Sequence, residues 1–345
     1  ARLCSGMTEP VRFGLGVPTA TEGMMYPVPY AGIEDAVRLA TEAEALGYDS
    51  VWGNDHVSTQ GYVRREYDQP PSFFDPLTYL AFVAAVTERI RLATCVLVLP
   101  FRHPVLVAKQ AATLDQLSGG RFVLGVGVGA YREEFEAMWP ERALHRGQYV
   151  DESVEALSLL LSDRRATYTG DVVAFDDVES FPKPVQKPLP ILSGGNSRAA
   201  RRRAGRYCNG WLPACLTPEE YRDGLTEIQE EAMRASRSLD GFEAAIQVAV
   251  SVDSTHEVAV ERFRSSQIYS HLMSLSDSTM QGRLADDLED RNLVGTPDAV
   301  CEKVSRYAEA GVCTLAGLLF ATDTVEATLD AMSMFAEEVV DSWTP

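Results

Sequence analysis

The chain has 345 residues, of which 46% are hydrophobic, and its 50 acidic residues outnumber its 31 basic ones to give a net charge of −19. This composition is that of a globular protein with a sizeable core, and the length suits either two average domains or one large α/β barrel. The negative charge disfavours binding to nucleic acid or to an anionic membrane surface, because like charges repel.

Hydrophobic patterning divides most of the chain into alternating strands and helices. Buried strands are predicted at 12–17, 48–53, 92–99, 121–126, 189–192, 210–214, 246–252 and 313–320. Helices are predicted at 33–46, 75–88, 105–117, 146–161, from 198 onward, and at 218–237, 297–310 and 325–340. Asp75, Thr217 and Thr296 are the predicted N-caps of three of these helices. A short hairpin is expected within 167–175.

Eight strands that alternate with helices predict a single (β/α)8 barrel, because parallel strands need helical crossovers on their outer face. We expect residues 1–11 to form a flexible tail and residues 12–345 to form one barrel domain with insertions in its βα loops. The charged, serine-rich stretch at 256–292 is the least core-like of these insertions.

No cysteine or histidine pattern indicates a metal site or a disulfide framework. The six cysteines include no CxxC pair, and the five histidines show neither HxH nor HExxH spacing. The sequence has no run long enough to span a membrane, and its first residues lack the pattern of a signal peptide. We therefore expect reduced thiols, no bound metal and a cytoplasmic location.

The loops after the carboxyl ends of the strands carry the candidate site residues, as is usual in α/β barrels. Asn54, Asp55 and His56 follow the second strand, where a histidine can move a proton near neutral pH and the Asp55 carboxylate can orient it. The alternative is a hydrogen-bonded loop histidine with no part in chemistry. Glu133 and Glu134 begin a helix, where acidic residues favour the helix dipole, so we interpret them as caps.

Two glycine-containing loops are candidates for binding a phosphate-bearing cofactor. The GxGxG pattern from Gly125 to Gly129 lacks the spacing of the dinucleotide fingerprint and equally suits a tight turn. The stretch Ser193–Ser197 stands between a strand and a basic helix that begins at Arg198. Free N–H groups at a helix start can bind a phosphate, and Ser197 and Arg198 add a hydroxyl and a positive charge. The alternative is an ordinary N-cap.

Several segments, in order and spacing, resemble the bacterial luciferase-like oxidoreductases, barrel enzymes that use FMN or the deazaflavin coenzyme F-420. The matching segments are SVWGNDH (50–56), the stretch from RIRLATCVLVLPFRHP to GGRFVLGVGVG (89–129), YREEFEAM (131–138), RGQYVDE (146–152), LSGGNS (192–197) and NGW (209–211). The Asp55–His56 pair, the LPFRHP loop and the GVGVGAYREEFEAM run are most similar to the actinobacterial F-420-dependent branch.

The resemblance implies a role for each candidate loop. The ring of the cofactor would lie in the barrel mouth against a non-proline cis peptide bond, its phosphate at the start of the basic helix, and His56 and Asp55 at the reacting atoms. The implied cofactor contacts are Cys95, Val96, Gly127, Val128, Gly129, Gly194, Gly195, Asn196, Ser197 and Arg198. Residues 256–292 would form a lid over the substrate, and the chain would form a homodimer.

The predicted function is hydride transfer between F-420 and a small, largely apolar organic substrate. The loops at 18–30, 59–72 and 256–292 hold many aromatic residues and methionines, which suggests an apolar pocket. Relatives that oxidise glucose 6-phosphate carry a tryptophan shortly after the histidine and a glutamate after the glycine loop. This chain has Thr59–Gln60 and Ala130 there, which argues against a sugar phosphate.

The alternative within the family is a two-component monooxygenase that receives reduced FMN from a separate reductase and activates O2. A non-catalytic flavin-binding barrel and a metal-dependent hydrolase are more distant alternatives.

Overall fold

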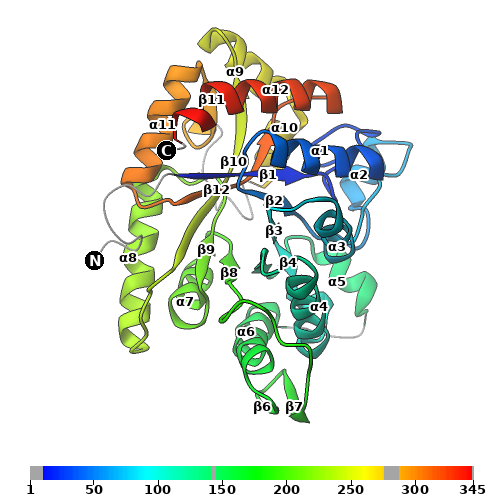
Figure 1. Ribbon diagram of the computed structural model, residues 1–345. Helices are drawn as coiled ribbons and strands as arrows, with labels where there is room; N and C mark the ends of the chain where they lie inside the picture. The colour runs from blue at the N-terminus through cyan, green and yellow to red at the C-terminus, as the bar shows by residue number, and fades with distance from the viewer. Residues whose placement is uncertain (1–10, 141–144, 276–286, 344–345) are drawn as a thin grey trace.

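The computed structural model describes residues 11–140, 145–275 and 287–343. Within these ranges, eight parallel strands close into a barrel with helices packed around the outside (Figure 1). Around the barrel, the strands are β1 (Arg12–Val17), β2 (Ser50–Gly53), β3 (Arg91–Thr94), β5 (Phe122–Gly127), β8 (Ile191–Gly194), β9 (Gly210–Leu212), β10 (Glu243–Val252) and β12 (Thr314–Phe320). Because β12 pairs with β1, the barrel is closed and the predicted (β/α)8 fold is confirmed.

The main outer helices are α1 (Ile33–Ala45), α3 (Pro76–Val86), α4 (Pro104–Leu117), α6 (Arg146–Ser162), α7 (Arg198–Tyr207), α8 (Pro218–Arg234), α11 (Pro297–Glu309) and α12 (Val325–Glu338). The three predicted N-caps are confirmed. The Asp75 side chain accepts the Thr78 N–H at 2.9 Å, Thr217 forms a capping box with Glu220, and Thr296 caps α11.

Hydrophobic side chains fill both sides of the strand layer. One large cluster lies between the strands and the helices, and a smaller one fills the inside of the barrel. The inner cluster consists of Trp52, Ala93, Val123, Leu192, Leu212, Ala245 and Ala316. The strands are therefore buried on both faces, which is why their sequences are almost continuously apolar.

Most strands lie within two residues of their predicted bounds, and two differ more. The strand predicted at 92–99 is interrupted after Thr94 by a cis peptide bond between Cys95 and Val96, and a separate strand, β4 (Leu97–Val98), then pairs with β5. Strand β10 begins earlier than predicted, because the polar Glu243 at its start is neutralised by Arg91 on β3, whose Nη2 lies 2.7 Å from Glu243 Oε2.

The insertions contain short elements that the sequence pattern did not resolve. These are α2 (Gly61–Glu66), α5 (Arg132–Met138), α9 (His256–Ser265), α10 (Gln267–Ser274) and β11 (Leu293–Gly295), which pairs with β10. The expected hairpin is confirmed as β6 (Ala166–Thr169) and β7 (Ala174–Val178). Residues 276–286 of the expected lid and 1–10 of the expected tail lie outside the described residues, whereas Val11 is buried in the core.

In the described ranges, no helix is long and apolar enough to cross a membrane, and no three His, Cys, Asp or Glu side chains gather as a metal site would require.

Candidate active site

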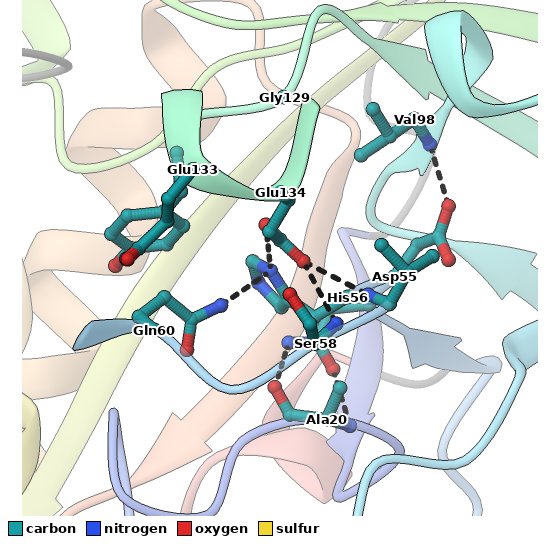
Figure 2. A network of polar contacts seen from close by, with 12 residues as sticks. Ala20, Asp55, His56, Ser58, Gln60, Val98, Gly129, Glu133 and Glu134 are labelled. Carbon is teal, nitrogen blue, oxygen red and sulfur yellow. Dashed lines mark hydrogen bonds and ion pairs between the residues drawn. The ribbon is translucent and has the colours of Figure 1, made fainter. Parts of the chain in front are cut away.

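A buried carboxylate holds His56 at the carboxyl end of the barrel. His56 follows β2, and Glu134 lies in the first turn of α5. The Nδ1 atom of His56 is 3.0 Å from Glu134 Oε2, and Glu134 Oε1 accepts the Val57 N–H at 2.9 Å (Figure 2). Glu134 is buried and His56 only partly so. Because an ionised carboxylate can only accept, this pairing favours a proton on Nδ1 and leaves Nε2 to exchange one.

The expectation that Asp55 orients His56 is wrong. Asp55 Oδ2 accepts the Val98 N–H at 2.9 Å, and Arg102 binds both carboxylate oxygens, with 3.0 Å between Nη2 and Oδ1. Asp55 and His56 therefore face different surroundings, although they are neighbours in the chain. Asp55 therefore fixes the loop, and Glu134 takes the orienting role that the sequence analysis gave to Asp55.

The interpretation of both glutamates as simple caps also needs correction. Glu133 accepts the Gly61 N–H with both oxygens, at 2.8 and 2.9 Å, and so ties α5 to α2. Glu134 is 1% exposed and contacts His56 from across the mouth. The only sequence signal was a pair of acidic residues after a glycine loop, and that pattern does not say which of the two turns inward.

Two tyrosines and a second histidine meet beside His56. The Tyr62 hydroxyl lies 3.2 Å from that of Tyr131 and 3.4 Å from Nδ1 of His271 on α10, and the Tyr131 ring centroid is 5.6 Å from that of His56. Burial lowers the pKa of His271 to about 4 and raises the pKa of both tyrosines, so all three side chains are neutral at pH 7. No local pattern in the sequence reveals this cluster, because its members lie far apart in the chain.

The cis peptide bond expected between Cys95 and Val96 is present, and it places Val96 between two glycines. A Cβ atom added at Gly127 or at Gly194 would overlap a different methyl group of Val96. These two glycines are thus required by packing between strand ends, whatever binds above them. Val128, one residue beyond Gly127, is exposed.

The start of α7 offers backbone N–H groups, but most of its positive charge is already paired. Ser197 caps the helix, and the N–H groups of Arg198 and Ala199 have no acceptor among the described residues. The arginines further along α7 bind carboxylates: Arg201 binds Glu227, Arg202 and Arg203 bind Asp151, and Arg206 binds Glu231.

Asn196 and Gly195, both predicted to bind the phosphate, already use polar groups in contacts within the protein. The side-chain amide of Asn196 is engaged on both sides by the backbone of Ala214, at 2.8 and 2.9 Å, so it is not available to a ligand. Gly195 adopts a φ of 107°, a conformation suited to glycine, and its N–H is donated to Leu212 O. The exposed Arg198 forms no ion pair within the described ranges.

A small apolar cavity of about 60 Å³ lies next to His271, between the middle of β10 and the end of β12. Its lining residues are Met25, Ala214, Cys215, Gln247, Val248, Ala249, Ile268, His271, Leu272, Leu275 and Leu319. None of them is charged, and only Gln247 and His271 carry side-chain nitrogen or oxygen. Arg291, whose guanidinium reaches Cys215 O, is neutralised by Glu220 and Asp287.

Residues 11–314 match the family described as luciferase-like monooxygenase. The chain belongs to this family. Among similar proteins, the F-420-dependent glucose-6-phosphate dehydrogenase of Microbacterium testaceum is 31% identical over 320 residues, which cover 88% of this chain and 90% of that protein. The corresponding dehydrogenase of Nakamurella multipartita is 31% identical over 81% of this chain and 85% of its own length.

Solved structures of luciferase-like proteins share the fold. A monooxygenase from Streptomyces bottropensis has a TM-score of 0.78 at 22% identity, over 96% of this chain and 100% of that one. An F-420-dependent secondary alcohol dehydrogenase, bound to an F-420–acetone adduct, has a TM-score of 0.77 at 21% identity, over 96% and 99%. Membership of the family confirms the resemblance and the oxidoreductase class. Both cofactors expected from the resemblance occur among similar proteins, F-420 in the dehydrogenases above and FMN in a structurally similar type II Baeyer–Villiger monooxygenase from Pseudomonas putida, solved in complex with FMN.

Proposed function

We propose that this luciferase-like protein transfers hydride between coenzyme F-420 and a small, uncharged and largely apolar organic substrate. The observation that carries the proposal is the His56–Glu134 pair in the barrel mouth, close to a cavity whose lining includes no charged side chain among the described residues. The relatives named above as F-420-dependent support the choice of cofactor, and the cavity supports the choice of substrate.

The residues present fit a phosphate-bearing cofactor at one point in particular. The N–H groups of Arg198 and Ala199, which have no acceptor among the described residues, and the positive side chain of Arg198 would hold the phosphate at the start of α7. The ring would lie against Val96 and Val128, near His56. Bound there, F-420 would supply or take up the hydride.

His56 would then move the proton that accompanies the hydride. With Nδ1–H held by Glu134, Nε2 can take a proton from a substrate hydroxyl in the oxidation direction and return it in the reduction direction. When His56 takes a proton from the substrate, the imidazolium that forms would be stabilised by the buried Glu134 carboxylate. The neutral tyrosines and His271 surround this step without adding a charge.

The proposed substrate differs from the one in the names of the relatives. A phosphate ester needs a cation that is free to bind it, whereas Arg102 and Arg291 are both committed to carboxylates. The lining from Met25, Ile268, Leu272 and similar residues suits an apolar body instead.

The test is a fluorescence and absorbance titration of the purified protein with F-420 and with FMN, each oxidised and reduced. Micromolar or tighter binding of F-420, with weak binding of FMN, is the expected result. A preference for reduced FMN would instead favour the two-component monooxygenase, which oxygen uptake with a reductase would then check. Binding of neither cofactor would refute the proposed function.

The proposal includes a cytoplasmic homodimer. Helix α3 carries no charged residue, yet Phe82 and Val86 are exposed on it, and Leu106 and Leu117 are exposed on the neighbouring α4. A helix that is apolar on all sides is normally covered. Sedimentation at several protein concentrations would reveal a dimer, and a monomer at all of them would contradict this part of the proposal.

A further inference from the structure

Gln60, the residue directly before α2, is fully buried beside His56. Its Nε2 lies 3.1 Å from Nδ1 of His56, and Glu134 Oε2 lies 3.0 Å from the same nitrogen (Figure 2). The Oε1 atom of Gln60 is buried and has no hydrogen-bond partner within the part of the chain that is described. Two groups therefore compete for one ring nitrogen, and half of the Gln60 amide is unsatisfied.

The chemistry of the three groups decides how the amide must be oriented. Nδ1 carries either a proton or a lone pair, so it cannot donate to Glu134 and accept from Gln60 at the same time. A carboxylate has no proton to donate, so in its contact with Glu134 the proton belongs on Nδ1 of His56. With Gln60 Nε2 in its observed position, its N–H would face the N–H of His56 Nδ1, and two donors form no hydrogen bond.

A half-turn of the Gln60 amide removes this conflict. The turn exchanges an oxygen and a nitrogen of nearly equal size, and the hydrogen-bond network decides between the two orientations. With Oε1 facing the ring, the Nδ1–H of His56 has two acceptors on one side. With Nδ1 protonated, the observed orientation leaves both amide atoms of Gln60 without a partner among the described residues, whereas the turned one leaves only Nε2, so the turn gains one hydrogen bond.

We infer that Gln60 is a positioning residue for His56, whose Nδ1 proton is shared between Gln60 Oε1 and Glu134. This inference rests on the proposed function only for its consequence in turnover. The two acceptors fix both the tautomer of the ring and its tilt. Nε2 is thereby kept as the nitrogen that exchanges a proton with the substrate, in either direction of the reaction.

The test is a nitrogen NMR spectrum of the cofactor-free protein with 15N-labelled histidine, in which His56 is assigned from the His56→Gln variant. The chain has only five histidines, so the spectrum is simple. We expect His56 to carry its proton on Nδ1, whereas a free neutral imidazole prefers the other nitrogen. In Gln60→Leu the share of the Nε2–H form should rise about fivefold, the effect of losing one hydrogen bond.

Gln110→Leu is the matched control, because Gln110 on α4 also has a buried Oε1 without a partner among the described residues. It should leave the His56 signals unchanged. Should Gln60→Leu fail to fold, Gln60→Met serves in its place. An Nε2–H form of His56 in the unmodified protein, or His56 signals that do not respond to Gln60 variants, would overturn the inference. Because no cofactor is present, failure of F-420 to bind leaves this result intact.

Discussion

Replacing Arg102 by methionine should destabilise the protein severely. The Arg102 side chain is 12% exposed and binds Asp55, which is 1% exposed, and also Asp75. Methionine fills a similar volume but leaves the Asp55 carboxylate buried with the Val98 N–H as its remaining partner. Removing one member of a buried ion pair costs about 3–5 kcal/mol, mainly because the other charge stays buried. We expect a loss of this size in the free energy of unfolding.

Urea unfolding followed by circular dichroism measures this loss. Arg132→Met is the control, since Arg132 and its partner Glu136 are 86% and 59% exposed, and an exposed pair contributes at most about 1 kcal/mol. The double variant Asp55→Asn/Arg102→Met should recover part of the stability, because it removes the buried charge. If Arg102→Met costs no more than Arg132→Met, the reasoning about this buried pair is wrong.

Three further predictions concern the mouth of the barrel. Glu134→Gln removes the negative charge that would stabilise the His56 imidazolium, so turnover should fall about 100-fold while F-420 binding changes little. Stopped-flow absorbance measures turnover and a fluorescence titration measures binding, and equal losses in both would contradict the prediction. Gly127→Ala should lower the free energy of unfolding by about 1–3 kcal/mol, because the added methyl group overlaps Val96. The double variant Gly127→Ala/Val96→Ala should recover most of this loss in thermal unfolding. If it recovers none, the contact does not limit the size of residue 127. Burial lowers the pKa of His271 to about 4 from 6.5, so the unfolded chain takes up this proton first as pH falls. The contribution of neutral His271 to the free energy of unfolding is therefore fully present above pH 6.5. This contribution should fall by about 3 kcal/mol as the pH is lowered to 4. His271→Gln should flatten the pH dependence of urea unfolding in this window, and an unchanged slope would count against the assignment.

The barrel was predictable because its strands are buried on both faces and its helices begin at recognisable caps. Periodicity is a local property, and Asp75, Thr217 and Thr296 each mark a helix start within a few residues of sequence. The same approach failed where a polar residue begins a strand, as at Glu243, because its neutralising partner Arg91 lies on a distant strand.

The site was predictable only in part, because a loop histidine can be recognised in sequence but its partner cannot. His56 stands out by type and position. The neighbouring Asp55 is the orienting group that the sequence predicts, whereas the partner in the structure, Glu134, is 78 residues away in the chain. Likewise, the Tyr62–Tyr131–His271 cluster forms only when three separate segments fold together.

The contact of Val96 with Gly127 and Gly194 has a consequence for how this sequence can diverge. The three residues follow or end three different strands, and each valine methyl group occupies the space of a missing side chain. A larger residue at position 127 or 194 is compatible with the fold only when position 96 becomes smaller. Across related chains, these three positions should therefore change together, and a pair of glycines should accompany a branched residue at position 96.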